Sequence, residues 1–333
     1  MVISDFRDYF TSLVEADKQQ IINELILILE SDSHISDGEG TNCTKCPHCE
    51  SERIRGNGFT ILKIQKYYCN GCNKHFSDQT NKIWCCVKKK SEMQKYIYGL
   101  LSGYSIRKSA TECKISINTS FIWRHKLLSC FAQISDQTYT GILEIDELFF
   151  QESQKGSRTM SRPSRKRGSP ATKRGISNEK VAVIATADRQ GSKGFSVIKL
   201  GRITKENVEQ VLENKIDNVE TICSDKHVSY EAYTKDKTIS HKTIMASHHQ
   251  RVTEKIYHVQ NVNNMDKRVR DFIRPRNGVA TKYLQNYLNW FLALEKIKNS
   301  INRHAQMAAM IIGAPQALKA YSQINVLHNL IRT

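Results

Sequence analysis

Cysteines in two Cys-x-x-Cys pairs are the first residues whose spacing indicates a particular chemistry. Cys46 and Cys49 form one pair, and Cys69 and Cys72 form the other after a basic and aromatic insert. Each pair can direct two thiolates at one point, and two pairs complete the tetrahedral sulfur site that Zn²⁺ prefers. Four thiolates leave no position open for water, so we predict a structural zinc ribbon, in which metal binding contributes roughly 10 to 16 kcal/mol to folding.

Other interpretations of these cysteines remain open. The four could be unpaired or redox-active thiols, and Cys43 or His48 could replace one of them as a ligand. A disulfide scaffold is disfavoured because the chain is long, at 333 residues, and opens without the basic and apolar segments of a secretory leader. No apolar run approaches the roughly 20 residues that a membrane span requires, so we expect a cytoplasmic protein.

Two carboxylates on apolar segments form a second candidate site. Asp146 interrupts the apolar run GILEIDELFF, and Asp225 ends the run VETICSD. Buried carboxylates are costly unless they are paired or hold a metal ion. If the two strands converge, Asp146 and Asp225 can hold Mg²⁺ or Mn²⁺ for attack on a phosphodiester by water or a 3′-hydroxyl. An isolated Asp at a strand end is more often a turn former or a helix cap, and this alternative stays open.

A helical segment near residue 265 carries polar residues that could join this site. Asn263 and Arg270 lie seven positions apart, with Asp266 at the intermediate turn, so all three share one helical face. We therefore predict that an amide oxygen and a phosphate-pairing guanidinium point toward the two carboxylates.

The elements that must position these residues indicate an α/β fold. Four apolar segments between residues 141 and 225 have the length and composition of strands, and a helical segment, TKENVEQVLENKI, lies between the last two. The expected order is N-terminal helices over 1–35, a zinc ribbon over 43–84, a helical module over 91–135, an α/β domain over 140–300 and a helical tail over 301–333. The tail either covers the core or makes an interface.

The helical module has the pattern of a helix-turn-helix. We expect one helix to end at Gly103, a second to run from Ser105 to Cys113, and a third to begin at Ser116 or Asn118. Such a module presents its last helix to the major groove of DNA. The alternative is a helical linker in which Ile122 and Trp123 only pack. The predicted DNA-contacting residues of the last helix are Asn118, Ser120, Arg124 and His125.

The charge balance favours a polyanionic partner. The chain has 50 Lys and Arg against 33 Asp and Glu, a formal net charge of +17. Nucleic acid is the first candidate and an anionic membrane surface the second. A loop over residues 152–178 concentrates the charge, with eight basic residues and no acidic one between Lys155 and Arg174. We expect it to contact DNA without sequence preference, chiefly through Arg165, Lys166, Arg167, Lys173 and Arg174.

With these residues in place, the chain resembles bacterial insertion-sequence transposases that join an N-terminal zinc ribbon to a DDE-type domain. The resemblance covers most of the chain. The motifs that carry it are CPHC…CNGC, ISINTSFIWRHKLL, EIDELFF, RKRGSPATKRGISNEK, SDKHVSYEAY and HVQNVNN…RPRNGVATKYLQNYLNWF.

The resemblance implies an RNase H-like fold for residues 140–300 and assigns roles within it. Asp146 and Asp225 fall on the first two catalytic carboxylates, and Asn263 falls on the third position, which is Glu in many relatives and Asn in one branch. An Asn offers Mg²⁺ a neutral oxygen and lowers the negative charge of the site. Arg270 stands where relatives usually carry Lys, and Asp266 stands where they tend to carry His, so Asp266 could itself reach the metal.

The implied function is metal-dependent cleavage and strand transfer at the terminal inverted repeats of an insertion sequence. His258 matches the family motif and is expected to contact the scissile phosphate. The implied partners are double-stranded DNA, both element ends and target, and further copies of this chain, at least a dimer on DNA. The implied location is the bacterial cytoplasm, with association to the nucleoid when DNA is bound. Two alternatives are a non-catalytic DNA-binding regulator derived from a transposase and a structure-selective nuclease.

Overall fold

The computed structural model describes residues 43–332 except for 61–63, 78–79, 81–86, 88, 165, 167–170, 226, 245–251, 255 and 315–316. The chain divides into two compact units at Thr80 and Asn81, which are considered separately below. The helices expected over residues 1–35 lie outside the described residues. No helix in the described part of the chain is both long enough and apolar enough to cross a membrane.

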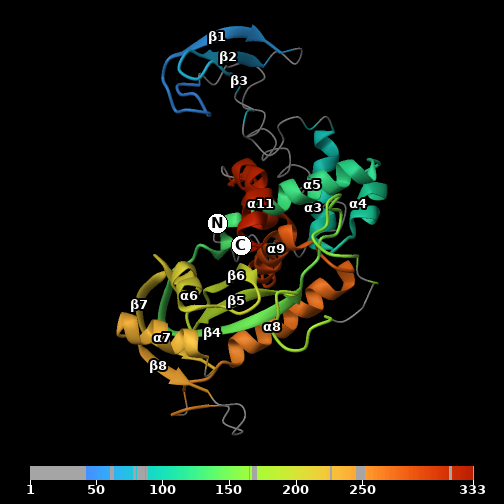
Figure 1. Cartoon of the computed structure of the whole chain (residues 1–333). Helices are drawn as coiled ribbons and strands as arrows, with labels where there is room; N and C mark the ends of the chain where they lie inside the picture. Colours follow the sequence, from blue (N-terminus) through green and yellow to red (C-terminus); the bar gives the residue numbers. More distant parts are fainter. Residues whose placement is uncertain are drawn as a thin grey trace, which may run out of the picture. The chain divides into compact units, whose positions relative to one another are not determined.

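The first unit is built on a three-stranded antiparallel sheet (Figure 1). Its strands are β1 (Ile54–Phe59), β2 (Gln65–Cys69) and β3 (His75–Ser77), in the order β1-β2-β3. The core is very small and contains Cys46, Tyr67, Cys69 and Phe76, with the Tyr67 and Phe76 rings stacked 5.4 Å apart. So small a core gives little hydrophobic stabilisation, and the unit therefore depends on its cysteine site.

The second unit contains a five-stranded mixed sheet in the order β6-β5-β4-β7-β8. β4 (Tyr139–Gln151), β5 (Lys180–Asp188) and β6 (Lys193–Leu200) form an antiparallel meander. β7 (Ile216–Ser224) lies parallel to β4 on its other side, and β8 (Ser240–Thr243) lies parallel to β7. This topology is that of the RNase H-like fold, so the predicted α/β fold class is confirmed.

Helices cover both faces of the sheet, which explains why almost every residue of β5 is buried. On one face α6 (Lys205–Leu212) packs with α7 (Val228–Lys237) over an apolar cluster that includes Ile145 and Ile184. On the other face α8 (Gln260–Ile273) lies along β4, as Figure 1 shows, and α9 (Leu284–Ile297) packs on β6. Short 3₁₀ turns occupy Ala132–Ser135, Arg274–Arg276 and Thr281–Tyr283.

Three helices precede the sheet where the sequence predicts a helix-turn-helix. They are α3 (Lys90–Leu101), α4 (Ile106–Glu112) and α5 (Ile117–Ser129). The side chains of Ser105 and Ser116 accept hydrogen bonds from Lys108 N and Thr119 N, so each serine caps the helix that follows it. Gly103 has a positive φ of 68°, which lets the chain turn between α3 and α4.

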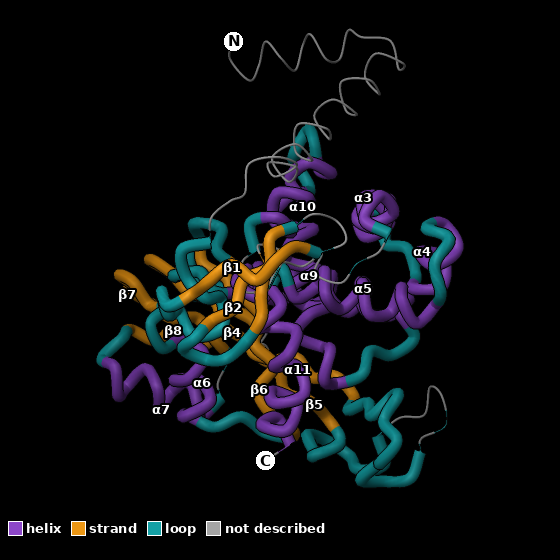
Figure 2. The backbone as a smooth tube through the Cα atoms, turned by 90° about the horizontal axis from the view of Figure 1, so that it is seen from above, coloured by secondary structure: helices purple, strands orange, loops and turns teal. Residues whose placement is uncertain are grey.

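The C-terminal segment covers the core. It forms α10 (Arg303–Ile312) and α11 (Ala317–Arg332), which bury Met307, Ile311 and Ile324. Figure 2 shows α5, α9 and α11 close together. α5 packs against both α9 and α11. Buried residues of α3, α5, the sheet and α11 belong to one continuous apolar cluster.

Among the described residues, the strands of the sheet and the helices of the helical module lie close to their predicted positions. The sequence analysis did not anticipate α7 or the short strand β8, although both flank the segment that follows Asp225.

Candidate metal centres

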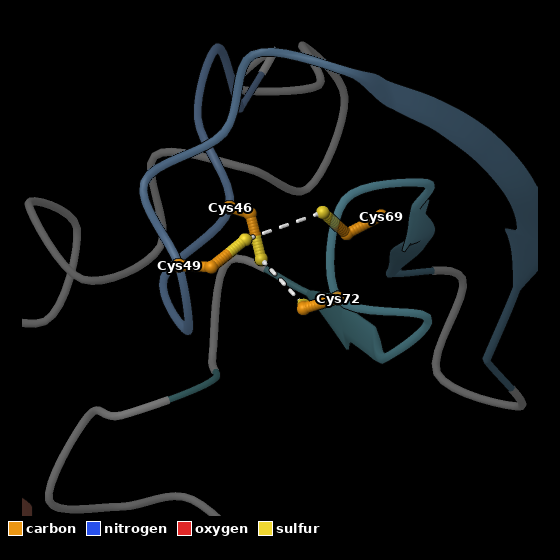
Figure 3. A group of neighbouring side chains, drawn as sticks. All are labelled: Cys46, Cys49, Cys69 and Cys72. Atoms are coloured by element: carbon orange, nitrogen blue, oxygen red, sulfur yellow. Dashed lines mark hydrogen bonds between the residues drawn. The ribbon is translucent and has the colours of Figure 1, made fainter.

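The four paired cysteines converge on one point. Their Sγ atoms all lie within 4.8 Å of one another, and Figure 3 shows the two pairs facing each other. Cys46 Sγ is 3.6 Å from Cys72 Sγ, and Cys49 Sγ is 3.6 Å from Cys69 Sγ. These separations are far longer than a disulfide bond of about 2.05 Å and match the edges of a tetrahedral thiolate site. Neither Cys43 nor His48 is part of this group.

The backbone around each pair is shaped to hold two sulfur atoms. Glu50 and Asn73, each four residues after the first cysteine of its pair, have φ of 60° and 55°, a tight left-handed turn. Backbone N–H groups of His48 and Gly71 point at Cys46 Sγ and Cys69 Sγ, at 3.4 and 3.3 Å. N–H groups directed at sulfur stabilise the thiolate form, so this geometry fits a metal site.

The second group of ligand atoms lies beside the middle of β4, where the neighbouring parallel strand β7 ends. Asp146, Glu147 and Asp225 each offer a carboxylate oxygen, and these oxygens lie within 4.8 Å of one another. The register explains the convergence: Glu144 on β4 is opposite Cys223 on β7, which aligns Asp146 with Asp225 two residues further along. Glu147 is the member of this group that the sequence analysis did not select.

Burial raises the pKa of all three carboxyl groups, and repulsion by neighbouring carboxylates adds to the rise for Asp146 and Glu147. The pKa of Asp146 is raised to about 6, first by burial and then by Asp225, against a hydrogen bond from the Glu147 N–H. The pKa of Glu147 is raised to about 8, by burial and by the two aspartates. The pKa of Asp225 is raised by burial, while His227 and His241 lower it. Hard oxygen donors crowded in this way are the ligand set that Mg²⁺ or Mn²⁺ takes.

One face of α8 completes this site. Asn263, Asp266 and Arg270 line the same hollow as Asp146, with a volume of about 450 Å³. Arg270 donates a hydrogen bond from Nη1 to the Phe149 carbonyl at 3.2 Å. Burial raises the pKa of Asp146 and of Asp266, and the positive charge of Arg270 opposes this rise without cancelling it. The structure therefore brings Asn263 and Arg270 to the Asp146 side of the site.

A buried carboxylate fixes α8 against β4. Glu144 is fully buried and accepts hydrogen bonds from Asn261 N at 2.8 Å, Asn261 Nδ2 at 2.8 Å and Val262 N at 3.2 Å. Arg189 Nη2 pairs with Glu144 Oε1 at 3.0 Å. Glu144 thus serves as the acceptor for the N-terminal turn of α8, a role that its sequence position beside Asp146 does not reveal.

His258 belongs to this network. Its Nε2 lies 2.8 Å from Arg189 Nη1, and its Nδ1 lies 3.4 Å from Glu144 Oε1 and accepts from the Gln260 N–H at 3.3 Å. Both ring nitrogens are engaged within the chain. The structure therefore gives His258 a part in positioning α8, and its contact with the scissile phosphate stays a prediction.

Three of the four residues predicted on α5 to contact DNA are buried, and that part of the prediction is wrong. Arg124 is 2% exposed and donates hydrogen bonds to the Tyr104 carbonyl and to Ser109 Oγ. Ser120 donates to the Ile106 carbonyl at 2.7 Å.

His125 is the third, and it stacks on the Tyr283 ring with a centroid separation of 3.7 Å. Burial lowers its pKa to about 3, so the imidazole stays neutral. Asn118 alone of the four is exposed, beside Ile117 and Ile122. The other three residues, Ser120, Arg124 and His125, hold α5 against its neighbours.

The basic loop is described in part. Arg165 and Arg167 lie outside the described residues, whereas Lys166, Lys173 and Arg174 are exposed. Lys166 lines a hollow of about 810 Å³, together with Lys155 and Arg162 of the same loop and Arg107 of α4. The positive charge of Arg162 is partly neutralised, because its Nε forms an ion pair with the buried Glu152 at 2.9 Å.

A mixed sheet of this topology, with carboxylates gathered between the middle of β4 and the end of β7, defines a DDE-type RNase H-like domain. Residues 138–292 match the family model described as the ISXO2-like transposase domain. Residues 138–292 therefore form a domain of this transposase type. No curated protein is similar enough in sequence to serve as a relative.

Solved structures of transposases are weakly similar in fold. A pre-cleavage Mos1 transpososome aligns at 9% identity over 66% of this chain and 78% of that chain, with a TM-score of 0.23. A Drosophila P element transposase strand transfer complex aligns at 10% identity over 72% of this chain and 64% of that chain, with a TM-score of 0.28. Scores this low add nothing to the assignment, which stands on the family match.

Proposed function

We propose that this transposase binds the terminal inverted repeats of its own element and catalyses metal-dependent strand cleavage and strand transfer there. The observation that carries the proposal is the cluster of Asp146, Glu147 and Asp225 oxygens within 4.8 Å, in a domain of transposase type. Carboxylates do not gather with raised pKa values unless a cation or a proton compensates them. A catalytic cation site explains the arrangement and the family together.

In this proposal the residues of the site have distinct roles. Asp146, Asp225 and Glu147 hold divalent cations, and Asn263 offers an uncharged amide oxygen from α8. When bound, the cations supply Lewis-acid activation of a water or a 3′-hydroxyl and neutralise charge at the phosphodiester. Arg270 pairs with a non-bridging phosphate oxygen and orients the scissile strand. Glu144 keeps α8 in register, so the amide and the guanidinium face the carboxylates.

Contacts to DNA fall on the exposed basic and amide groups. Arg107, Lys155 and Lys166 around the larger hollow suit phosphate contacts, as do Lys173 and Arg174 on the loop. Asn118 is the candidate for a base contact by α5, because an asparagine amide pairs well with the edge of adenine. The zinc ribbon, held by four thiolates, stabilises its small sheet and presents Arg53 and Arg55 for further phosphate contacts.

Cleavage of a labelled duplex that bears one element end, with Mg²⁺ or Mn²⁺ added, tests the proposal. The full chain should produce nicks at the end and joined products with a target duplex. Asp146→Asn and Asp225→Asn should each lower the cleavage rate by roughly 10³-fold or more while leaving end binding nearly unchanged. Cleavage that survives both substitutions would show that the site lies elsewhere.

The alternatives differ in their products. A non-catalytic regulator would bind end DNA and yield no cleavage with either metal. A structure-selective nuclease would cut the duplex but give no joined product. The intact carboxylate cluster favours catalysis over regulation, and the family match favours strand transfer over simple hydrolysis.

A further inference from the structure

Asp266 shares the face of α8 that lines the metal site. Asn263, Asp266 and Arg270 follow one another at intervals of three and four residues, so they form a row along the helix. The hollow of about 450 Å³ that this row lines also contains Asp146 and Glu147. Asp266 therefore stands one helical turn beyond Asn263 and faces the same space.

The Asp266 carboxylate is buried without full compensation. Asp266 is 8% exposed, and its Oδ1 has no hydrogen-bond partner among the described residues. Glu144, by contrast, accepts three hydrogen bonds and an arginine contact. Burial and the Asp146 charge raise the pKa of Asp266, Arg270 opposes this rise, and the Arg270 Nη1 group donates its hydrogen bond to the Phe149 carbonyl. An uncompensated buried carboxylate is costly, and it persists where another group is to be bound.

The lack of compensation at Asp266 coincides with a lack of negative charge at the third position of the site. The third position of the site is the neutral Asn263, so α8 contributes no negative charge from that residue. Two divalent cations carry four positive charges, whereas Asp146, Glu147 and Asp225 offer three negative ones. A carboxylate on the same helical face, one turn away, would supply the fourth.

We propose that Asp266 is a ligand of the catalytic divalent cations and provides the negative charge that Asn263 does not. The proposal rests on the function proposed above and adds one residue to its site. Asn263 then offers an uncharged oxygen beside Asp266. The positive charge of Arg270 offsets the negative charges of Asp266 and of the DNA phosphate. The alternative is that Asp266 only steadies Arg270, with no contact to the cation.

Mn²⁺ binding to the full, zinc-loaded chain in the absence of DNA tests the assignment by a readout other than activity. Electron paramagnetic resonance measures free Mn²⁺ during a titration. Asp266→Asn should weaken Mn²⁺ binding by about 10- to 100-fold, the effect seen when a metal site loses a supporting group. The substitution is nearly isosteric and removes an uncompensated charge, so thermal unfolding should show a midpoint at or above that of the unaltered chain.

Two further variants make the result specific. Asp271→Asn is the matched control, since Asp271 lines the rim of the same hollow but is half-exposed and pairs with Arg274 at 2.9 Å. It should bind Mn²⁺ as the unaltered chain does. The double variant Asn263→Glu with Asp266→Asn moves the carboxylate back one turn and should restore affinity to within about threefold, a shift of less than 1 kcal/mol.

The outcomes separate this inference from the function on which it rests. Loss of Mn²⁺ affinity in Asp146→Asn but not in Asp266→Asn would overturn the role of Asp266 and leave the proposed metal site standing. An unaltered chain that binds no Mn²⁺, or Asp146→Asn with unchanged affinity, would overturn both. Weakened Mn²⁺ binding in Asp266→Asn without recovery in the double variant would contradict the proposal that Asp266 provides the negative charge that Asn263 does not.

Discussion

Glu144 accepts hydrogen bonds from both the backbone N–H and the side-chain amide of Asn261, a residue 117 positions later in the chain. Glu144 lies two residues before Asp146 on β4, and Asn261 lies two residues before Asn263 on α8. The same contact therefore sets the position of the helix that carries Asn263 relative to the strand that carries Asp146. A carboxylate at a helix N-terminus is also favoured by the helix dipole.

Loss of the Glu144 carboxylate should be among the most destabilising single changes in the sheet domain. Glu144→Ala is expected to lower the free energy of unfolding by roughly 3 to 5 kcal/mol, because the Arg189 guanidinium and the N-terminal amides of α8 lose their acceptor. Asn261→Ala removes one side-chain hydrogen bond and should cost about 1 kcal/mol. Urea unfolding at neutral pH measures both, and equal effects from the two variants would contradict the central role of Glu144.

Removal of the metal from the cysteine site should unfold the first unit. Its apolar core is very small, so the four thiolates and their cation carry most of the free energy of folding. Cys46→Ser or Cys69→Ser should abolish stoichiometric zinc binding and make residues 43–80 sensitive to protease. Cys43→Ser is the control, since Cys43 lies outside the ligand group, and it should retain one zinc ion per chain by elemental analysis. Loss of zinc in Cys43→Ser together with retention of zinc in Cys46→Ser would show that Cys43, and not Cys46, is the ligand.

The stability of the magnesium-free protein should fall as the pH rises. The pKa values of Asp146, Asp266 and Glu147 are raised to about 6, 7 and 8, with burial as the largest cause of each. A carboxyl group with a raised folded pKa contributes stability below its unfolded pKa and loses that contribution as the pH passes the folded value. The free energy of unfolding should therefore decline between about pH 4 and pH 8.

Millimolar Mg²⁺ should restore the stability lost at pH 8, because bound cations replace the protons. Glu147→Gln should flatten the decline in its upper range, since Glu147 has the highest pKa of the three. Tryptophan fluorescence during urea unfolding, with zinc retained and magnesium omitted, follows the effect. A stability that rises over this pH range would contradict the assigned pKa shifts.

Two residues six positions apart on α5 should separate DNA binding from folding. Asn118→Ala should weaken binding of end DNA by about 1 to 3 kcal/mol and leave the unfolding midpoint unchanged, because the side chain is exposed. Arg124→Ala should instead lower the free energy of unfolding by roughly 2 to 4 kcal/mol, since the guanidinium is buried over the Trp290 ring. Fluorescence anisotropy with labelled duplex and thermal unfolding measure the two effects. A reversed pattern would mean that α5 meets DNA through its other face.

Local patterns predicted much of this molecule, and long-range packing decided the rest. The spacing of Cys46 to Cys72 and the serine caps at Ser105 and Ser116 are local signals, and the structure contains the sulfur cluster and the helix starts that they indicate. The burial of Arg124 depends on α9, more than 150 residues away, so the periodicity of α5 could not reveal it. The hydrogen bonds between Glu144 and α8 likewise need a partner that no local pattern around β4 specifies.

The position of Trp123, Leu127 and Phe131 has a consequence for how much of the chain is needed to fold the sheet domain. The family match starts at residue 138, but these three side chains lie before it and belong to the apolar cluster that also holds β5 and α9. The stretch that is inherited as a recognisable domain is therefore shorter than the stretch that must fold together. A chain shortened to the matched segment would leave α9 without these partners, so the sheet domain has to be produced together with α3 to α5.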